Sequence, residues 1–186
     1  ELQPTEIGPL VDSLLRQHSA VAEAAGVRIV TLVRADAFAL ADGLMLFRVL
    51  SNLMDNAIKF SPPGTTVLVA LRSGGARWRL QVRDAGMGIA PEAQARVFEE
   101  FVQMHNEARD RRQGLGLGLA IARRLALLMN GDIAVRSALG RGTCMTVSLP
   151  PALRPPEAGS AHAEAASSVP GVLMPLLGPA LQKPVF

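Results

Sequence analysis

Residues 1–150 alternate between segments with helical spacing of apolar residues and shorter segments with the composition of β-strands. The strand-like segments come in clusters, and two of them flank Gly74-Gly75, which is typical of a hairpin turn. Helices separated by such clusters predict an α+β fold, with the helices on one face of a mixed sheet. The expected helices are 7–25, 41–60, 91–98 and 117–129, and the expected strands are 27–33, 37–40, 66–72, 78–83, 132–137 and 143–149.

Proline divides the chain into two parts. Seven of the 13 prolines lie in 151–186. The stretch 155–168 is small, polar and flanked by proline, as in a flexible linker. Beyond it, 170–186 is apolar but too rich in proline for a long helix. We therefore expect one domain over residues 1–150 and a linker or tail over 151–186.

Composition excludes several classes of protein. The formal net charge is +3 with no dense basic run, which argues against a nucleic-acid binder. The single cysteine excludes an internal disulfide and a zinc site made of several cysteines. The three histidines lack metal-ligand spacing, and no run of about 18 apolar residues is present to span a membrane.

The segment 52–60 carries the first candidate site. Asn52, Asn56 and Lys59 follow the spacing i, i+4, i+7 and so share one helix face. Asparagine is unfavourable inside a helix, and its amide oxygen suits Mg²⁺, while lysine suits phosphate. Lys59 is also the only lysine in residues 1–150. A solvated polar helix face explains the same spacing, and the spacing alone leaves both interpretations open.

Two glycine-rich segments carry further candidates. In 83–90, Asp84 ends a strand and could accept a hydrogen bond from a base amino group, although this motif alone favours an ordinary turn. In 114–121, three alternating glycines open a helix, whose free N–H groups suit phosphate; a hinge is the alternative. This spacing is neither the dinucleotide-binding nor the P-loop pattern.

Five motifs in order across residues 48–150 resemble the catalytic ATP-binding domain of sensor histidine kinases. They are SNLMDNAIKFSP, DAGMGIA, VFEEFVQ, GLGLGLAIARRLALLM and RSALGRGTCMTVSLP. The wider superfamily includes type II topoisomerases, heat-shock chaperones and mismatch-repair proteins. The resemblance implies a two-layer α/β sandwich of the Bergerat type. It would have a mixed, mostly antiparallel sheet of about five strands, about three helices on one face, and a mobile ATP lid near 102–116.

The resemblance also implies residue roles. Asn56 would ligate Mg²⁺ with support from Asn52, Lys59 would contact phosphate, and Asp84 would bind the adenine amino group. The remaining nucleotide-binding set is Gly86, Gly88, Ile89, Gly114, Gly116, Leu117, Gly118, Leu119 and Thr143. Phe98 and Phe101 would anchor the lid, and Arg109, Arg111 and Arg112 within it could reach phosphate or simply be solvated.

The expected activity is transfer of the γ-phosphoryl group of ATP to a histidine. Hydrolysing members of the superfamily place a glutamate base where this chain has Asn52, which cannot take a proton. None of His18, His105 and His162 has the acidic-x-x-x-Pro context of an acceptor. We therefore expect a cytoplasmic fragment of a two-component signalling kinase that lacks its phosphoacceptor.

The partners implied are the dimerisation and histidine-phosphotransfer domain of the same kinase, as a homodimer in the full protein, and a response regulator receiver domain. The alternatives are a degenerate nucleotide-sensing or protein-interaction module without phosphotransfer, and a hydrolysing ATPase of the same superfamily. We expect no contact of this fragment with nucleic acid or membrane.

Overall fold

The structure is a computed structural model that describes residues 1–34, 36–99 and 117–155. The chain separates into two units, Glu1–Arg154 and Pro155–Phe186. All helices and strands described below belong to the first unit. In the described part of the chain, no helix combines the length and the apolar character needed to cross a membrane.

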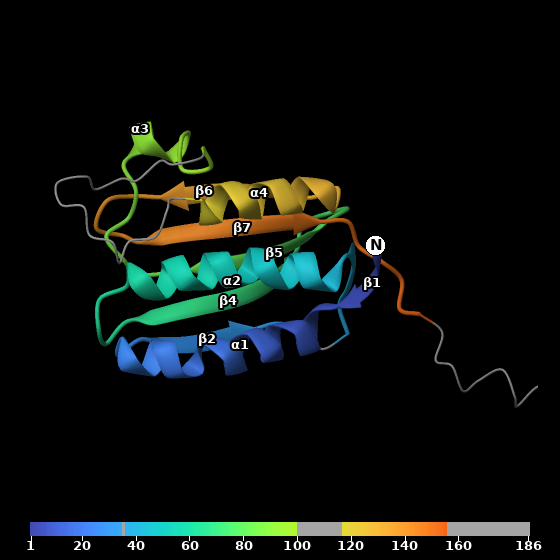
Figure 1. Cartoon of the computed structure of the whole chain (residues 1–186), viewed down its shortest axis with the longest axis horizontal. Coiled ribbons are helices and arrows are strands. Elements are labelled where there is room, and N and C mark those ends of the chain that lie inside the picture. The colour runs from blue at the N-terminus through green and yellow to red at the C-terminus, as the bar shows by residue number, and fades with distance from the viewer. Residues whose placement is uncertain (35, 100–116, 156–186) are drawn as a thin grey trace, which may run out of the picture. The chain divides into compact units, whose positions relative to one another are not determined.

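A five-stranded mixed sheet forms one layer (Figure 1). Strands β2 (Arg28–Leu32) and β4 (Thr66–Ser73) run parallel, and every other neighbouring pair is antiparallel. The remaining strands are β5 (Trp78–Arg83), β6 (Asp132–Ser137) and β7 (Thr143–Leu149), in the order β2-β4-β5-β7-β6. The predicted hairpin across Gly74-Gly75 joins β4 to β5.

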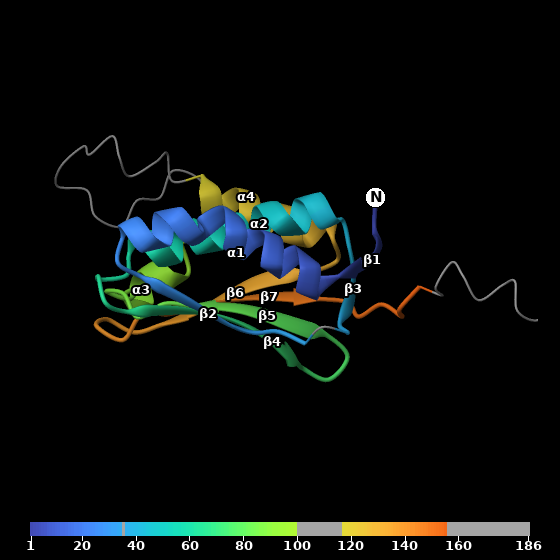
Figure 2. The ribbon, with the colours of Figure 1, turned by 90° about the horizontal axis from the view of Figure 1, so that it is seen from below.

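Three helices form the second layer on one face of this sheet (Figure 2). They are α1 (Ile7–Ala24), α2 (Gly43–Lys59) and α4 (Gly118–Leu128), and α2 lies between the other two. Asp42 starts α2 by accepting a hydrogen bond from the Met45 backbone N–H at 3.0 Å, which satisfies one of the free donors of the first turn. The predicted α+β fold with helices on one face is confirmed.

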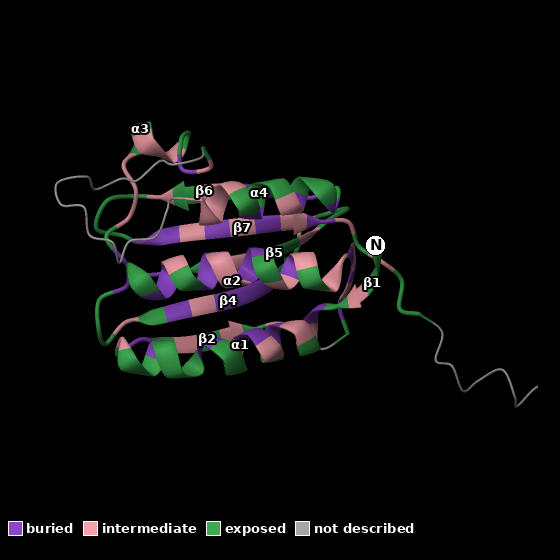
Figure 3. Cartoon of the chain, in the orientation of Figure 1, coloured by how far each residue is buried: buried purple, intermediate pink, exposed green. Residues whose placement is uncertain are grey.

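The core lies between the two layers (Figure 3). Alternate residues of the strands face it, because successive side chains of a strand point to opposite faces. Leu80 and Val82 of β5 and Met145 and Val147 of β7 are buried there. The apolar side of α2 packs onto them with Leu46, Val49, Leu50, Leu53, Met54, Ala57 and Ile58.

Two local expectations differ from the structure. The predicted strand 37–40 is β3 (Phe38–Ala41), but it pairs with β1 (Gln3–Glu6) in a separate two-stranded sheet. The predicted helix 91–98 is only α3 (Pro91–Gln94). After it, Arg96 and Glu99 donate backbone hydrogen bonds three residues back, to Ala93 and Arg96, so the α-helical pattern does not continue.

We predict that Leu46→Ala lowers the free energy of unfolding by about 2–5 kcal/mol, because it leaves a cavity under α2. Leu46 has no exposed surface, whereas Leu44 on the same helix is 75% exposed. Leu44→Ala is therefore the matched control and should change stability by less than about 0.5 kcal/mol. Urea unfolding followed by circular dichroism measures both, and equal losses would contradict the packing described.

Candidate functional site

The polar side of α2 meets the start of α4. Asn52 and Asn56 are partly buried on α2. A Cβ atom added to Gly118, the first residue of α4, would lie 3.2 Å from Oδ1 of Asn52. Leu117 precedes the helix and makes no side-chain cap, so the first N–H groups of α4 are not capped by that residue. The structure thus brings Asn52 next to a helix N-terminus, which favours negative charge.

The other end of α2 meets the turn 84–89. Lys59 is the last residue of α2, and its Nζ lies 5.1 Å from the centre of the exposed Phe60 ring. The Cα of Gly86 lies so close to the Phe60 carbonyl that a Cβ would collide with it. Since Asn52 and Phe60 are eight residues apart, the two contacts are about 12 Å apart along the helix. The middle helix therefore touches both glycine-rich segments.

Asp84 is the buried acid of this region. Its side-chain Oδ1 accepts hydrogen bonds from the backbone N–H groups of Gly86 at 2.8 Å and Thr143 at 3.1 Å. Its own N–H donates to the Thr143 carbonyl at 2.9 Å. Among the described residues, none donates a hydrogen bond to the other carboxylate oxygen, Oδ2. Oδ2 is therefore available to accept a hydrogen bond from a ligand.

Burial raises the pKa of Asp84 above its ordinary value. Desolvation is the largest cause, since it disfavours the charged carboxylate. The hydrogen bonds from the backbone N–H groups of Gly86 and Thr143 act in the opposite direction. A carboxylate held this way in a buried position is a frequent property of functional sites.

Two glycines allow the turn after Asp84 to lie against the β6–β7 turn. Gly88 has φ of +74° and leaves no room for a Cβ beside the Ala138 carbonyl. Gly142 has φ of +81° and leaves no room beside the Asp84 carbonyl. Both positions require glycine for conformation and for space. This close approach is what brings Thr143 to Asp84.

Ser137 and Gln94 connect the same turns, although sequence reasoning did not identify either. The Ser137 hydroxyl accepts from the Ile89 N–H and lies within hydrogen-bonding distance of the Gly142 carbonyl and the Thr143 hydroxyl, at 2.8–2.9 Å. The Gln94 amide donates to the Ile89 and Ser137 carbonyls, both at 2.9 Å. The only feature of the sequence that pointed to Ser137 is its position inside the motif RSALGRGT. The sequence gives no signal for Gln94.

His18 was another residue without a predicted role. His18 is 2% exposed on α1; its Nδ1 lies 2.8 Å from the Leu14 carbonyl and its Nε2 lies 3.1 Å from Oδ1 of Asp55. Asp55 directly precedes Asn56 on α2. The contact joins α1 to α2 at the helical turn that carries the candidate asparagines. The sequence did contain a signal for the burial of His18, since this residue continues the apolar helix face of Val11 and Leu14.

Several predicted residues lie outside the described part of the chain. These are the whole expected lid at 102–116, with His105, Arg109, Arg111, Arg112, Gly114 and Gly116, and also Phe101. Phe98 is described: it packs on the core, and the Arg123 guanidinium lies 5.4 Å from its ring centre. Leu119 also packs on the core. Within the described residues, no group of three His, Cys, Asp or Glu side chains could hold a metal ion.

The comparisons with known proteins agree with this arrangement. The family described as "Histidine kinase-, DNA gyrase B-, and HSP90-like ATPase" matches residues 41–153. The sensor-like histidine kinase SenX3 of Mycobacterium tuberculosis is 38% identical over 146 residues, 78% of this chain and 35% of the relative. The sensor histidine kinase RppB of Synechocystis is 34% identical over 145 residues, 77% of this chain and 32% of the relative. This chain thus spans about a third of the length of these curated relatives.

Solved structures give the same result. Full-length ShkA in complex with AMPPNP has a TM-score of 0.72 and 36% identity, and the match covers 83% of this chain and 32% of that one. The mycobacterial sensor histidine kinase MprB has a TM-score of 0.71 and 28% identity, covering 81% of this chain and 98% of that one. The fold is therefore that of histidine kinase catalytic domains. The chain belongs to the histidine kinase-, DNA gyrase B- and HSP90-like ATPase family.

We predict that Gly142→Ala destabilises the domain more than Gly140→Ala, by about 1–3 kcal/mol. Both residues have positive φ, +81° and +71°, so both alanines pay a similar conformational cost. Only the Cβ at residue 142 meets another group, the Asp84 backbone, while the space around Gly140 is open. Chemical denaturation measures the free energy of unfolding of the two variants. Equal values would show that a Cβ at residue 142 is accommodated beside Asp84 without cost.

Proposed function

We propose that this domain binds Mg²⁺-ATP in the region bounded by α2, the turn 84–89 and the start of α4, and donates the γ-phosphoryl group to a histidine on another domain. The observation that carries the proposal is the Asp84 carboxylate, because one oxygen is held by two backbone N–H groups and the other is left to accept. This arrangement suits an adenine amino group, which is a donor.

The phosphate end of the proposed site lies toward Asn52 and Gly118. The N-terminus of α4 favours anions, and the missing side chain of Gly118 lets Asn52 approach it. Asn56 lies one turn further along the same face of α2, where its amide oxygen would hold Mg²⁺ together with the phosphates. When bound, the ion would neutralise negative charge on the phosphates. Lys59 lies three residues beyond Asn56, at the end of α2, and would supply a cation to the phosphates through its long side chain.

Transfer to a protein, rather than hydrolysis, is supported by Asn52. A neutral amide cannot act as the general base that activates water. Sensor histidine kinases among the relatives, and the AMPPNP complex of ShkA, support the same nucleotide and reaction class. Phosphoryl transfer itself depends on positioning and charge neutralisation, which this arrangement could provide. No observation favours a degenerate module or a hydrolysing enzyme.

The partners follow from the reaction class. We infer a dimerisation domain that carries the acceptor histidine, and a response regulator that receives the phosphoryl group, as the sensor kinase relatives suggest. We also propose that the domain works in the cytoplasm, where ATP is available. We further propose residues 1–150 as the catalytic domain and 151–186 as a linker or tail.

We predict that Asp84→Asn weakens binding of a non-hydrolysable ATP analogue by about 10-fold or more, because the amide presents a donor in place of an acceptor. The variant should keep its thermal stability near pH 7, since the raised pKa means that ionised Asp84 disfavours folding. Isothermal titration calorimetry measures the affinity, with Asp12→Asn on the exposed side of α1 as control. Unchanged affinity in Asp84→Asn would contradict the adenine site.

The affinity of the wild type should also fall in acid. Protonation removes the acceptor, and the raised pKa makes this happen at a higher pH than the ordinary value of 3.8. Affinity should therefore be full above the pKa of Asp84 and decline as the pH falls through it, and Asp84→Asn should lack this decline. Circular dichroism at each pH separates loss of binding from acid unfolding.

Phosphotransfer is tested by mixing the domain with a purified dimerisation domain of a related kinase and labelled ATP. We predict acid-labile phosphohistidine on the added domain, and loss of at least 100-fold of the rate in Asn56→Ala. Free phosphate should not accumulate in the absence of the acceptor. Steady phosphate release by the isolated domain would instead indicate a hydrolase, and analogue binding without phosphohistidine would indicate a nucleotide sensor.

A further inference from the structure

The face of the sheet opposite the helices carries a row of basic side chains. Arg83 of β5 and Arg136 of β6 are both in register with Cys144 of β7, which lies between them. Their neighbours Val82, Val135 and Met145 belong to the core or pack against it. Because side chains alternate along a strand, Arg83, Cys144 and Arg136 point away from the helices. Figure 2 shows that no described helix covers this face.

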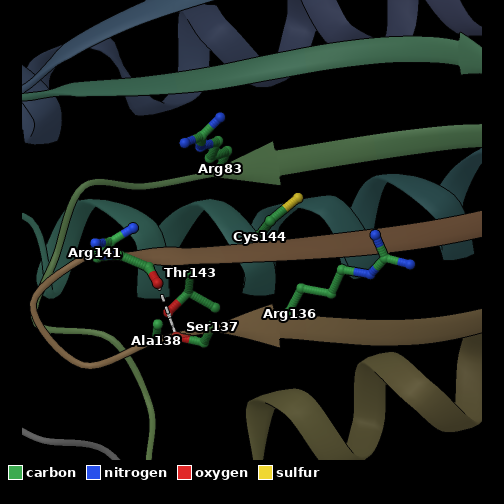
Figure 4. Close-up of a pocket in the computed structure, with 8 residues that line it drawn as sticks. Arg83, Arg136, Ser137, Ala138, Arg141, Thr143 and Cys144 are labelled. Atoms are coloured by element: carbon green, nitrogen blue, oxygen red, sulfur yellow. Dashed lines mark hydrogen bonds between the residues drawn. The ribbon is translucent and has the colours of Figure 1, made fainter.

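These residues line a depression of about 290 Å³ (Figure 4). Arg141, from the turn between β6 and β7, adds a third guanidinium group to the lining. The rest of the lining is small or uncharged: Ser137, Ala138, Gly142, Thr143 and Cys144. No carboxylate is among the lining residues.

The three guanidinium groups are not neutralised by the described part of the protein. None of them takes part in an ion pair or a side-chain hydrogen bond with a described residue. By contrast, Arg34 pairs with Asp36 and Arg96 pairs with Glu99. Arg83 and Arg136 are two strand spacings apart, about 10 Å at the backbone, which equals the screening length of about 10 Å at 0.1 M salt, so their charges repel each other in low salt. A bound anion would remove that repulsion.

We propose that this depression is a second anion site, which binds a small, multiply charged anion of the phosphate class. Guanidinium groups offer paired N–H donors that match phosphate oxygens, and three of them supply the charge. Arg83, Arg136 and Cys144 lie on the opposite face of the sheet from Asn52, Asn56 and the core-facing α2, whereas Gly142 and Thr143 of the lining also contact Asp84. Anion binding by the arginines does not require that the nucleotide site binds ATP.

Cys144 makes the proposal directly testable, since it lines the depression and is the only cysteine of the chain. The experiment compares its alkylation by iodoacetate, which is negatively charged, and by iodoacetamide, which is neutral. Changes in thiol accessibility or reactivity affect both reagents, so the ratio of their rate constants reports the local field. We expect Arg83→Gln and Arg136→Gln each to lower the iodoacetate-to-iodoacetamide ratio by about threefold or more.

The control is Arg28→Gln, which removes one charge from an exposed residue of β2, at the other edge of the same sheet. It should leave the ratio nearly unchanged. In the wild type, pyrophosphate without added magnesium should slow the alkylation of Cys144 by iodoacetate, and this protection should saturate as the pyrophosphate concentration rises. Asn56→Ala should keep this protection, whereas Arg136→Gln should lose it. Thermal unfolding verifies that each variant is folded, and Arg141→Gln provides a third test of the lining.

Three results would overturn the proposal. Equal ratios in the wild type and both strand variants would show that the arginines create no site. An equal fall of the iodoacetate-to-iodoacetamide ratio in Arg28→Gln would show that the ratio reports the total charge of this face of the sheet and not a local site. Protection by poly-glutamate but not by pyrophosphate would show that the depression accepts an acidic protein surface instead of a small anion.

Discussion

Burial of the apolar side of α2 against the sheet is the constraint on which the rest of the structure depends. Leu46, Leu50 and Leu53 are almost completely removed from solvent, and α1 and α4 pack on either side of the same helix. Because those positions face the core, the asparagines between them are directed to the remaining side of α2. The rotation of one helix about its axis therefore decides where Asn52 and Asn56 lie. The same packing presents the end of α2 to the turn that follows Asp84.

The second feature on which the site depends is the close contact between the backbone of the turn after Asp84 and the backbone of the β6–β7 turn. Gly142 and Gly88 let two turns approach so closely that a methyl group at either position would collide with a carbonyl. The resulting bonds between Asp84 and Thr143 fix a carboxylate in a buried position, and none of the described residues donates to its second oxygen. Ser137 and Gln94 satisfy other polar groups of these turns. A buried acid is tolerated because the backbone supplies its donors, as buried polar groups require.

The two faces of the sheet differ in kind. The helix-covered face holds the core and, at its end, neutral amides, a single acid and glycine turns. The open face carries arginines without carboxylate partners in the same depression. Thr143 and Cys144 are neighbours in the chain and both line the depression, and the backbone N–H of Thr143 also donates to Asp84. One short strand thus contributes to both the proposed nucleotide site and the proposed anion site.

The sequence by itself determined the fold class, the main helices, the hairpin and the family, because helical periodicity, glycine turns and five ordered motifs are local signals. It also singled out Asn52, Asn56, Asp84 and Thr143 as candidates. Only the tertiary structure decided that β3 pairs with β1 outside the main sheet, and that Ser137, Gln94 and His18 join distant segments. It also decided that Arg83, Arg136 and Arg141 line one depression together with Cys144. These contacts depend on strand order and helix packing, and such long-range pairings leave no periodic trace in the chain.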